Sequence, residues 1–86
     1  MIQLLFKPTF IRQLNKIDEG FLPEVFEKIE LFKDTKNHQA LKVHKLHGSL
    51  SDYYGFSVNY QTRIVFQYLT KKEVVFMAIG DHDIYK

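Results

Sequence analysis

Two polar residues stand out in the apolar and aromatic C-terminal half of the chain, and both could act on a phosphate ester. Arg63 opens a β-rich run where an apolar residue would serve a core better, and its guanidinium group suits bidentate binding of phosphate. His82 follows the last apolar run, and an imidazole gives or takes a proton near neutral pH. Two other interpretations stay open at this point: an ion pair of Arg63 with Glu73 or Asp52, and a surface histidine in a polar tail.

A short basic run lies upstream of these two residues. Lys42, His44, Lys45 and His47 follow one another closely, whereas acidic residues crowd positions 18–34. The formal net charge of the chain is only +2, so a positive face forms only if the fold separates these two groups. The basic run is then suited to the phosphate backbone of a nucleic acid, and a solvated basic loop is the alternative.

Metal and cofactor chemistry has little support in the sequence. His44, His47, His82 and Asp83 are of types that bind zinc or iron, but a His-x-x-His spacing outside a predicted helix is a weak signal. The sequence has no phosphate-cradling glycine loop, no zinc finger and no serine or cysteine nucleophile motif. We therefore expect a protein that uses no metal and no cofactor.

Three consecutive strands must position Arg63 and His82. Residues 53–60, 63–70 and 73–80 are rich in β-branched and aromatic residues and are separated by short polar breaks, which predicts an antiparallel unit. In the first strand, alternation predicts one face made of Tyr54, Phe56, Val58 and Tyr60.

The N-terminal half predicts one strand, over residues 2–7, and two helices. Pro8 and Pro23 each suit the first turn of a helix, where the missing N–H would be unpaired anyway. Gly20 suits a left-handed cap between the two helices. Apolar residues at helical spacing predict the inner faces of the helices: Phe10, Leu14, Val25, Phe26, Ile29 and Phe32.

The resulting order of elements is βααβββ, which predicts an α+β fold of one domain over residues 1–86. We expect an antiparallel sheet with the helical hairpin packed on one face and the other face open to solvent or a ligand. The apolar runs are far too short to span a membrane, and the start of the sequence lacks the features of a signal peptide. We therefore expect a cytoplasmic protein.

Three segments carry a resemblance to a known family. They read His44-Lys-Leu-His-Gly-Ser-Leu-Ser-Asp-Tyr-Tyr, Arg63-Ile-Val-Phe and Ile79-Gly-Asp-His-Asp-Ile-Tyr85. Together with the length and the order of elements, they resemble the YafQ-like and YoeB-like mRNA interferases of the RelE/ParE superfamily of type II toxin–antitoxin toxins. The resemblance implies a RelE-like fold, an endoribonuclease that cleaves mRNA on the ribosome and so inhibits translation, and a cognate antitoxin protein as partner.

The same resemblance implies roles for individual residues. His44 and His82 match catalytic positions, Arg63 matches a phosphate-stabilising arginine, and Tyr85 matches a C-terminal tyrosine. Cleavage by the neighbouring 2′-hydroxyl needs a base, an acid and positive charge at the phosphate, which the two histidines and the arginine would supply. Which histidine is the base stays open. The basic run of Lys42, Lys45 and His47 would then bind RNA.

Departures from the family patterns leave two other functions open. The histidine and aspartate that YafQ-type toxins carry appear here as Ser57 and Gln61. One alternative is a ParE-like inhibitor of DNA gyrase, against which His82 argues, because ParE-type chains usually lack a terminal histidine. The other is a catalytically degenerate member that only binds an antitoxin.

Overall fold

The computed structural model describes residues 1–48 and 52–81 of the chain. Two of the predicted site residues, His82 and Tyr85, therefore lie outside the described residues. In the described part of the chain, no helix is long and apolar enough to cross a membrane.

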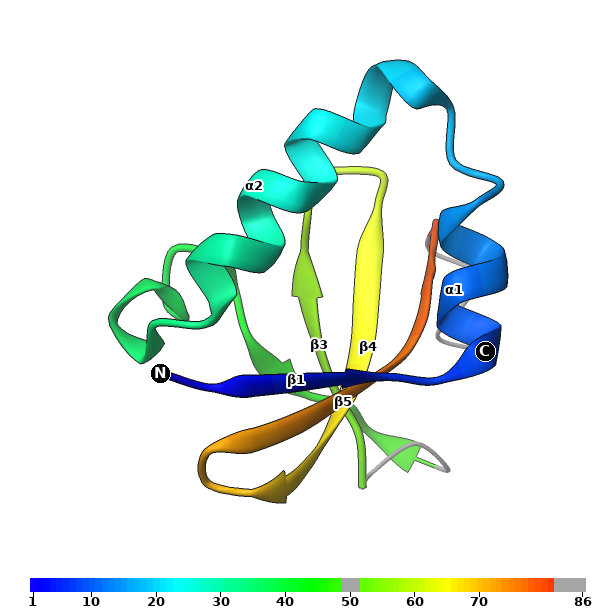
Figure 1. Cartoon of the computed structure of the whole chain (residues 1–86). Helices are drawn as coiled ribbons and strands as arrows, with labels where there is room; N and C mark the ends of the chain where they lie inside the picture. Colours follow the sequence, from blue (N-terminus) through cyan, green and yellow to red (C-terminus); the bar gives the residue numbers. More distant parts are fainter. Residues whose placement is uncertain (49–51, 82–86) are drawn as a thin grey trace.

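One five-stranded sheet forms the centre of the molecule, in the order β1-β5-β4-β3-β2. Neighbouring strands from β2 to β5 are antiparallel, whereas β1 lies at one edge and runs parallel to β5. Figure 1 shows that β1 runs across β3 and β4, because the sheet twists strongly. The strands are β1 (Gln3–Phe6), β2 (His44–Lys45), β3 (Tyr54–Ser57), β4 (Arg63–Thr70) and β5 (Glu73–Gly80).

The predicted α+β class is confirmed, and β4 and β5 have the predicted bounds. Three details differ. The first predicted strand of the C-terminal half ends at Ser57, and the short strand β2 was not predicted. The sheet is also mixed, because β1 is parallel to β5. A tight turn makes consecutive strands antiparallel, but two helices and three strands separate β1 from β5 in the chain, so no such turn sets their relative direction.

Two short helices follow β1: α1 (Pro8–Leu14) and α2 (Leu22–Phe32), with 3-10 turns η1 (Glu19–Phe21) before α2 and η2 (Thr35–Asn37) after it. Proline occupies the first turn of each α-helix, as predicted.

The left-handed conformation predicted for Gly20 is wrong. Gly20 lies inside η1, where its N–H donates to the Asp18 carboxylate at 2.9 Å. The aspartate therefore caps the start of a new turn instead of the glycine ending the old helix.

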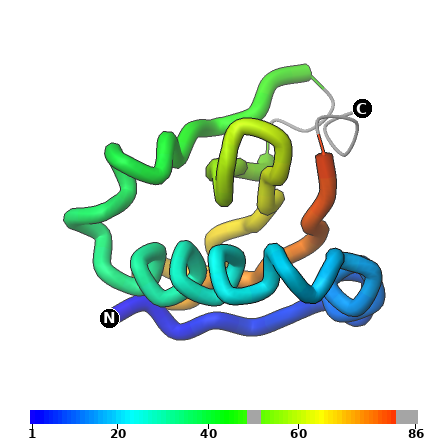
Figure 2. Tube along the Cα trace, turned by 90° about the horizontal axis from the view of Figure 1, so that it is seen from above, coloured from blue at the N-terminus to red at the C-terminus, as the bar shows by residue number. Residues whose placement is uncertain are grey.

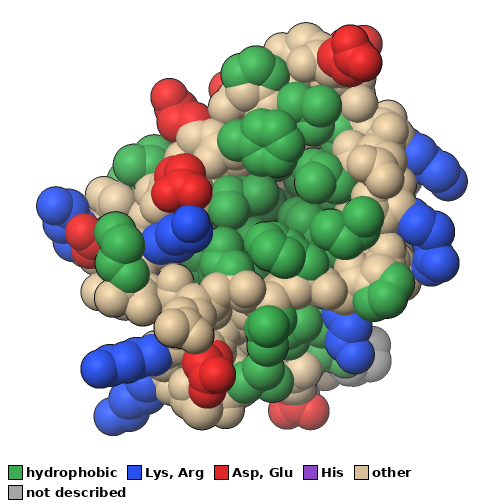
Figure 3. All heavy atoms as spheres, viewed as in Figure 1, with side chains coloured by type: hydrophobic (Ala, Val, Ile, Leu, Met, Phe, Trp, Pro, Cys, Tyr) green, Lys and Arg blue, Asp and Glu red, His purple; other side chains and the backbone are tan. Residues whose placement is uncertain are grey.

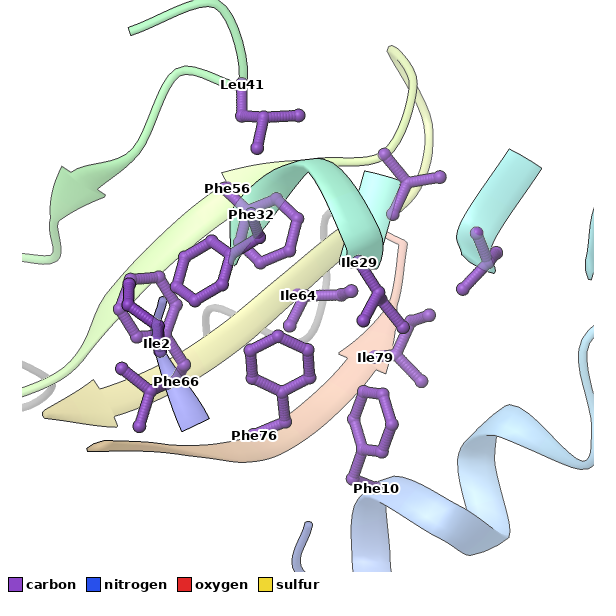
Figure 4. Packing of buried hydrophobic residues seen from close by; sticks show 13 residues of the cluster. Ile2, Phe10, Ile29, Phe32, Leu41, Phe56, Ile64, Phe66, Phe76 and Ile79 are labelled. Carbon is purple, nitrogen blue, oxygen red and sulfur yellow. The ribbon is translucent and has the colours of Figure 1, made fainter. Parts of the chain in front are cut away.

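Both helices pack on the same face of the sheet, and aromatic rings fill the space between the helices and the sheet (Figure 4). The Phe32 ring of α2 is fully buried and stacks on Phe56 with 4.8 Å between centroids. It also meets Phe66 and Phe76 edge-on, at 4.8 and 5.4 Å. The core thus joins α2 to three neighbouring strands through one side chain.

The predicted helical core is confirmed for Phe10, Val25, Ile29 and Phe32, and Leu14 packs against it half-buried. The prediction for Phe26 is wrong, because its side chain is 50% exposed. The two helices diverge from the η1 turn, as Figures 1 and 2 show, so the flank of α2 that carries Phe26 faces the gap between them.

The side of the sheet that faces away from the helices is termed the outer face. It carries His44, Gly55, Ser57, Arg63 and Val65, which alternate with the core residues along their strands. The prediction that this face is open holds only in part. Val65 and Val75 are 5% and 7% exposed, so its middle is covered.

Candidate active site

His44 and Arg63 share the outer face and stand on either side of β3. His44 on β2 is the Cα partner of Gly55, and Arg63 on β4 is the Cα partner of Ser57, two residues further along the same strand. Standard strand spacing and rise place the two Cα atoms on the order of 12 Å apart. Side chains of this length can therefore reach a common ligand from two sides.

The surface between His44 and Arg63 is built from small residues. Gly55 and Ser57 on β3 form this floor between the two residues, and Ala78 and Gly80 on β5 continue it on the far side of Arg63. A β-bulge at Met77 makes this possible, because it re-phases β5 so that Ile79 enters the core and its small neighbours face outward. A floor without long side chains lets a nucleic-acid backbone approach closely.

The ring of His44 is held by its own backbone neighbourhood. Its Nδ1 atom lies 2.8 Å from the carbonyl oxygen of Lys42. A carbonyl oxygen only accepts hydrogen bonds, so Nδ1 carries a proton in this contact, and the basic nitrogen of the neutral ring is Nε2. This is the tautomer that a general base acting through Nε2 requires, whereas a hydrogen bond from Nε2 to a phosphate oxygen requires the doubly protonated ring.

Lys42 provides this carbonyl group from a left-handed backbone conformation with φ of 60°. Its N–H donates to the carbonyl oxygen of Gln39 at 3.1 Å, and the N–H of Val43 donates to that of His38 at 3.0 Å. This pair of bonds is the Schellman motif, in which a glycine usually takes the left-handed position. A lysine there puts a cation beside the site at the expense of backbone strain.

His38 fixes the start of this turn to the core. Its Nε2 atom lies 2.8 Å from the carbonyl oxygen of Phe32, the last residue of α2, and its ring stacks on the Phe32 ring at 4.5 Å. Sequence reasoning did not identify His38. No pattern in the sequence indicates that His38 contacts Phe32, because this contact depends on how the chain turns between the two residues.

Arg63 organises the loop of residues 58–62, which joins β3 to β4. In the described part of the chain, both of its hydrogen bonds use Nη1, which donates to the carbonyl oxygens of Asn59 and Thr62. Neither Glu73 nor Asp52 forms an ion pair with it among the described residues. Glu73 lies at the far end of β5, opposite Thr70. The guanidinium group has further donors that could bind a phosphate.

A pocket of about 370 Å³ adjoins Arg63 between the 58–62 loop, the turn before β2 and the C-terminal half of α2. Three cationic side chains line it, together with an almost fully exposed tyrosine, Tyr60, at 85% exposure. The prediction that Tyr60 continues an apolar strand face is wrong, because β3 ends before it. The polar and charged lining residues are Lys28, Asn37, Lys42, Ser57, Asn59, Tyr60 and Arg63.

The remaining predicted site residues divide into two groups. Lys45 and His47 are exposed, on β2 and just after it, but Lys45 is the Cα partner of Tyr54 and therefore lies on the face of the sheet opposite to His44. His82 and Tyr85 lie outside the described residues, and Gly80, the Cα partner of Arg63, precedes them in the sequence. Across positions 1–48 and 52–81, no three His, Cys, Asp or Glu side chains gather closely enough to hold a metal ion.

A second hollow, wide and apolar, lies on the helix side of the molecule. It has a volume of about 800 Å³ and runs between α1, α2 and β1, where Figure 3 shows hydrophobic side chains gathered in a concave surface. This apolar groove includes side chains that are exposed despite their size, namely Phe6, Ile11 and Phe26. A concave apolar surface with large exposed side chains is a candidate site for a protein partner.

Solved structures share this fold. A conserved hypothetical protein from Helicobacter pylori is similar at 22% identity and a TM-score of 0.73, over 96% of this chain and 97% of that chain. YafQ from E. coli is similar at 15% identity and a TM-score of 0.79, over 98% and 97%. The toxin–antitoxin complex RelBE2 from Mycobacterium tuberculosis contains a chain similar at 17% identity and a TM-score of 0.71, over 94% and 98%. No protein-family model and no curated protein matches the sequence.

These similarities establish a RelE-like α+β fold for the chain, as the sequence resemblance implied. Each similarity covers nearly the full length of both compared chains, so it includes the strands that carry His44 and Arg63.

Proposed function

We propose that the chain is the toxin of a bacterial toxin–antitoxin module and acts as an endoribonuclease on mRNA engaged by the ribosome. The observation that carries this proposal is the placement of His44 and Arg63 on one sheet face, across a floor of small residues. The fold, shared with YafQ and with a chain of the RelBE2 toxin–antitoxin complex, supports it. The basic residues Lys42, Lys45 and His47 would contact the RNA backbone.

The proposed reaction is attack of a ribose 2′-hydroxyl on the adjacent phosphorus. The 2′-oxygen–phosphorus bond forms, the bond from phosphorus to the 5′-oxygen breaks, and a cyclic phosphate remains. One of the two histidines, His44 or His82, takes the proton of the attacking hydroxyl, and the other gives a proton to the leaving oxygen. Arg63 offsets the negative charge that builds on the phosphate oxygens. Tyr85 completes the set of residues that we assign to the reaction.

The cognate antitoxin would bind the apolar groove on the helix side. An amphipathic helix buries an apolar stripe in such a groove, and the three exposed side chains Phe6, Ile11 and Phe26 provide matching contacts. Since YafQ-like toxins are solved as complexes such as DinJ–YafQ, we expect the adjacent gene to encode this partner. Its acidic residues would cover the basic run around His44 at the same time.

Primer extension on a translated mRNA tests the activity, with wild-type protein compared with His82→Gln and Arg63→Lys. Glutamine keeps a hydrogen-bonding side chain but cannot titrate, so cleavage should fall by about 10²–10⁴-fold. Lysine keeps the positive charge but lacks the planar guanidinium group that binds phosphate through two hydrogen bonds, so cleavage should fall as well. Both variants should still bind the antitoxin.

The gyrase alternative predicts a different outcome. It requires DNA cleavage complexes and a damage response that depend little on His82. If His82→Gln arrests growth at the wild-type dose while mRNA stays intact, the nuclease proposal is wrong. A chain that neither arrests growth nor cleaves mRNA, yet binds the antitoxin, would be the degenerate binding member.

A further inference from the structure

The Tyr60 side chain is almost fully exposed, at the tip of a loop whose other residues are held by hydrogen bonds. The Asn59 side-chain oxygen accepts from the N–H groups of Gln61 and Thr62, at 2.8 Å each. The Val58 N–H donates to the Thr62 carbonyl oxygen at 2.9 Å, and the Arg63 guanidinium group holds the Asn59 carbonyl oxygen. Such a loop presents its aromatic ring at a fixed place, with little conformational entropy left to lose on binding.

The loop is also fastened to the helix layer. The Asn59 side-chain N–H donates to the Glu24 carboxylate at 2.8 Å, across 35 positions of the sequence. Asn59 thereby uses its side-chain oxygen within the loop and its side-chain nitrogen toward α2. The loop tip cannot move away from α2 without breaking this bond, so the pocket beside it has two fixed walls.

The charge around Tyr60 is positive where it faces the pocket. Lys28, Lys42 and Arg63 all line it. Lys28 is paired with the Glu27 carboxylate at 3.4 Å, so Lys42 and Arg63 supply the positive charge that remains for a ligand among the described residues. A ligand with an aromatic face and a negative charge therefore fits this pocket better than a cation or an apolar chain.

We propose that this pocket holds one nucleotide of single-stranded RNA next to the cleaved phosphate, with its base stacked on Tyr60. The inference rests on the proposed function and adds the position of a flanking nucleotide. A volume of about 370 Å³ lies at the small end of the range for ligand pockets, which suits a single nucleotide. Stacking accepts any base, whereas the polar side chains of Asn37 and Ser57 in the pocket offer hydrogen bonds to a base edge.

Lys42 and Arg63 connect the pocket to the outer face, because both also belong to the candidate active site. An RNA strand that passes from the pocket to the small-residue floor would keep its phosphates beside these two cations. Tyr60 would then be a binding and positioning residue that selects the register of the strand, while the proton transfers stay with the histidines.

The chain contains no tryptophan, so Tyr60→Trp introduces a single tryptophan emission at the proposed stack. The probe is a short single-stranded RNA with a 2′-O-methyl group at each ribose, which blocks the attack of the 2′-oxygen. We expect quenching on titration with this RNA. An oligonucleotide of the same length and charge with abasic sites should bind without quenching. Phe21→Trp is the matched control, because Phe21 is 54% exposed but does not line the pocket.

A second measurement compares Tyr60→Phe with Tyr60→Ala in binding of the same RNA. Phenylalanine keeps the ring and should bind as the wild-type chain does. Alanine should weaken binding about 10-fold, the size of one lost base–aromatic stack, with an unchanged dependence on salt because no phosphate contact is removed.

The outcomes separate the two proposals. RNA that binds the wild-type chain but neither quenches the emission of the Tyr60→Trp protein nor distinguishes Tyr60→Ala from Tyr60→Phe would overturn the stacking site alone. Equal quenching by the abasic oligonucleotide would do the same, since it shows phosphate contact without a stack. A wild-type chain that binds no RNA would overturn the stacking site, whereas the proposed function fails only if primer extension shows no cleavage of translated mRNA.

Discussion

The Nδ1 atom of His44 lies 2.8 Å from the carbonyl oxygen of Lys42, two residues earlier in the chain. The contact ties the orientation of a candidate catalytic ring to a backbone turn. That turn is itself anchored by His38 on the end of α2. The geometry of the site is therefore coupled to the core through the polypeptide backbone.

Replacing His44 with asparagine should separate structure from chemistry. The asparagine side-chain nitrogen can occupy the place of Nδ1 and keep the bond to Lys42, but no titrating nitrogen remains. We expect the melting temperature to change little and single-turnover mRNA cleavage to fall by about 10²–10⁴-fold. Retained cleavage by a folded His44→Asn protein would remove His44 from the reaction.

Replacing Lys42 with glycine should stabilise the protein while it weakens RNA binding. Glycine adopts a positive φ without strain, so the free energy of unfolding in urea should rise by about 1 kcal/mol. The loss of one phosphate contact should lower the slope of log affinity against log salt by about 0.7 for a single strand. Lys36→Gly, at an exposed position outside the pocket, is the control for the lost charge.

Two phenylalanines of α2 should respond very differently to truncation. Phe32 is fully buried in the aromatic core, so Phe32→Ala should lower the free energy of unfolding by about 3–5 kcal/mol. Phe26 is half exposed, so Phe26→Ala should lower it by less than about 1.5 kcal/mol. Chemical denaturation of both variants measures the difference, and equal losses would place Phe26 in the core after all.

If the apolar groove binds the antitoxin that we propose, a charge in the groove should block binding without unfolding the chain. Phe26→Glu places a carboxylate on the groove wall, where an apolar helix stripe would have to bury it, so antitoxin affinity should fall at least about 100-fold. Phe21→Glu changes an equally exposed ring outside the groove and should bind normally. Calorimetry with the product of the adjacent gene measures both, and equal binding would move the interface elsewhere.

Stability should decline at alkaline pH through Tyr68. Burial raises the pKa of Tyr68 above its usual value of 10.0, and the negative charge of ionised Tyr54 raises it further. A raised pKa means that the folded chain holds this proton more tightly than the unfolded chain. The contribution is therefore complete below about pH 10 and is lost as pH rises through the folded value.

Urea unfolding between about pH 8 and pH 11 tests this expectation, since the range brackets the ordinary tyrosine pKa. Tyr68→Phe removes the titrating hydroxyl and should flatten the alkaline decline, whereas Tyr60→Phe removes an exposed hydroxyl and is the control. A decline of the same steepness in the Tyr68→Phe protein would show that other groups cause it.

Much of the fold followed from local pattern. The strands of residues 63–70 and 73–80 were predictable because a two-residue turn, Lys71-Lys72, joins two apolar runs whose pairing it dictates. The helix starts were predictable because proline is favoured only in a first helical turn. The parallel pairing of β1 was not predictable, since no local feature of residues 3–6 indicates that Gln3 pairs with a residue as distant as Glu73.

The residue types of the candidate active site could be identified from the sequence, but the arrangement of these residues in space could not. His44 and Arg63 were identified from their chemistry and from the resemblance, but their common face depends on the register of β2 on β3. Tyr60 was assigned to an apolar face because its spacing continues that of Phe56 and Val58. The strand ends at Ser57, since the Asn59 side chain bonds two backbone N–H groups and turns the chain there.

The pairing of β1 with β5 joins Gln3 to Glu73 and Phe6 to Phe76, so the strand made first finds its neighbour only when the strand made last is present. A ribosome releases a chain from its N-terminus onward, and contacts this distant in sequence form late. Until β5 has emerged, the nascent chain lacks the strand that holds Ala78 and Gly80 beside Arg63, and the sheet around Arg63 is incomplete. If the chain is the nuclease that we propose, we expect it to stay inactive as long as the ribosome is still reading its message upstream of the Gly80 codon.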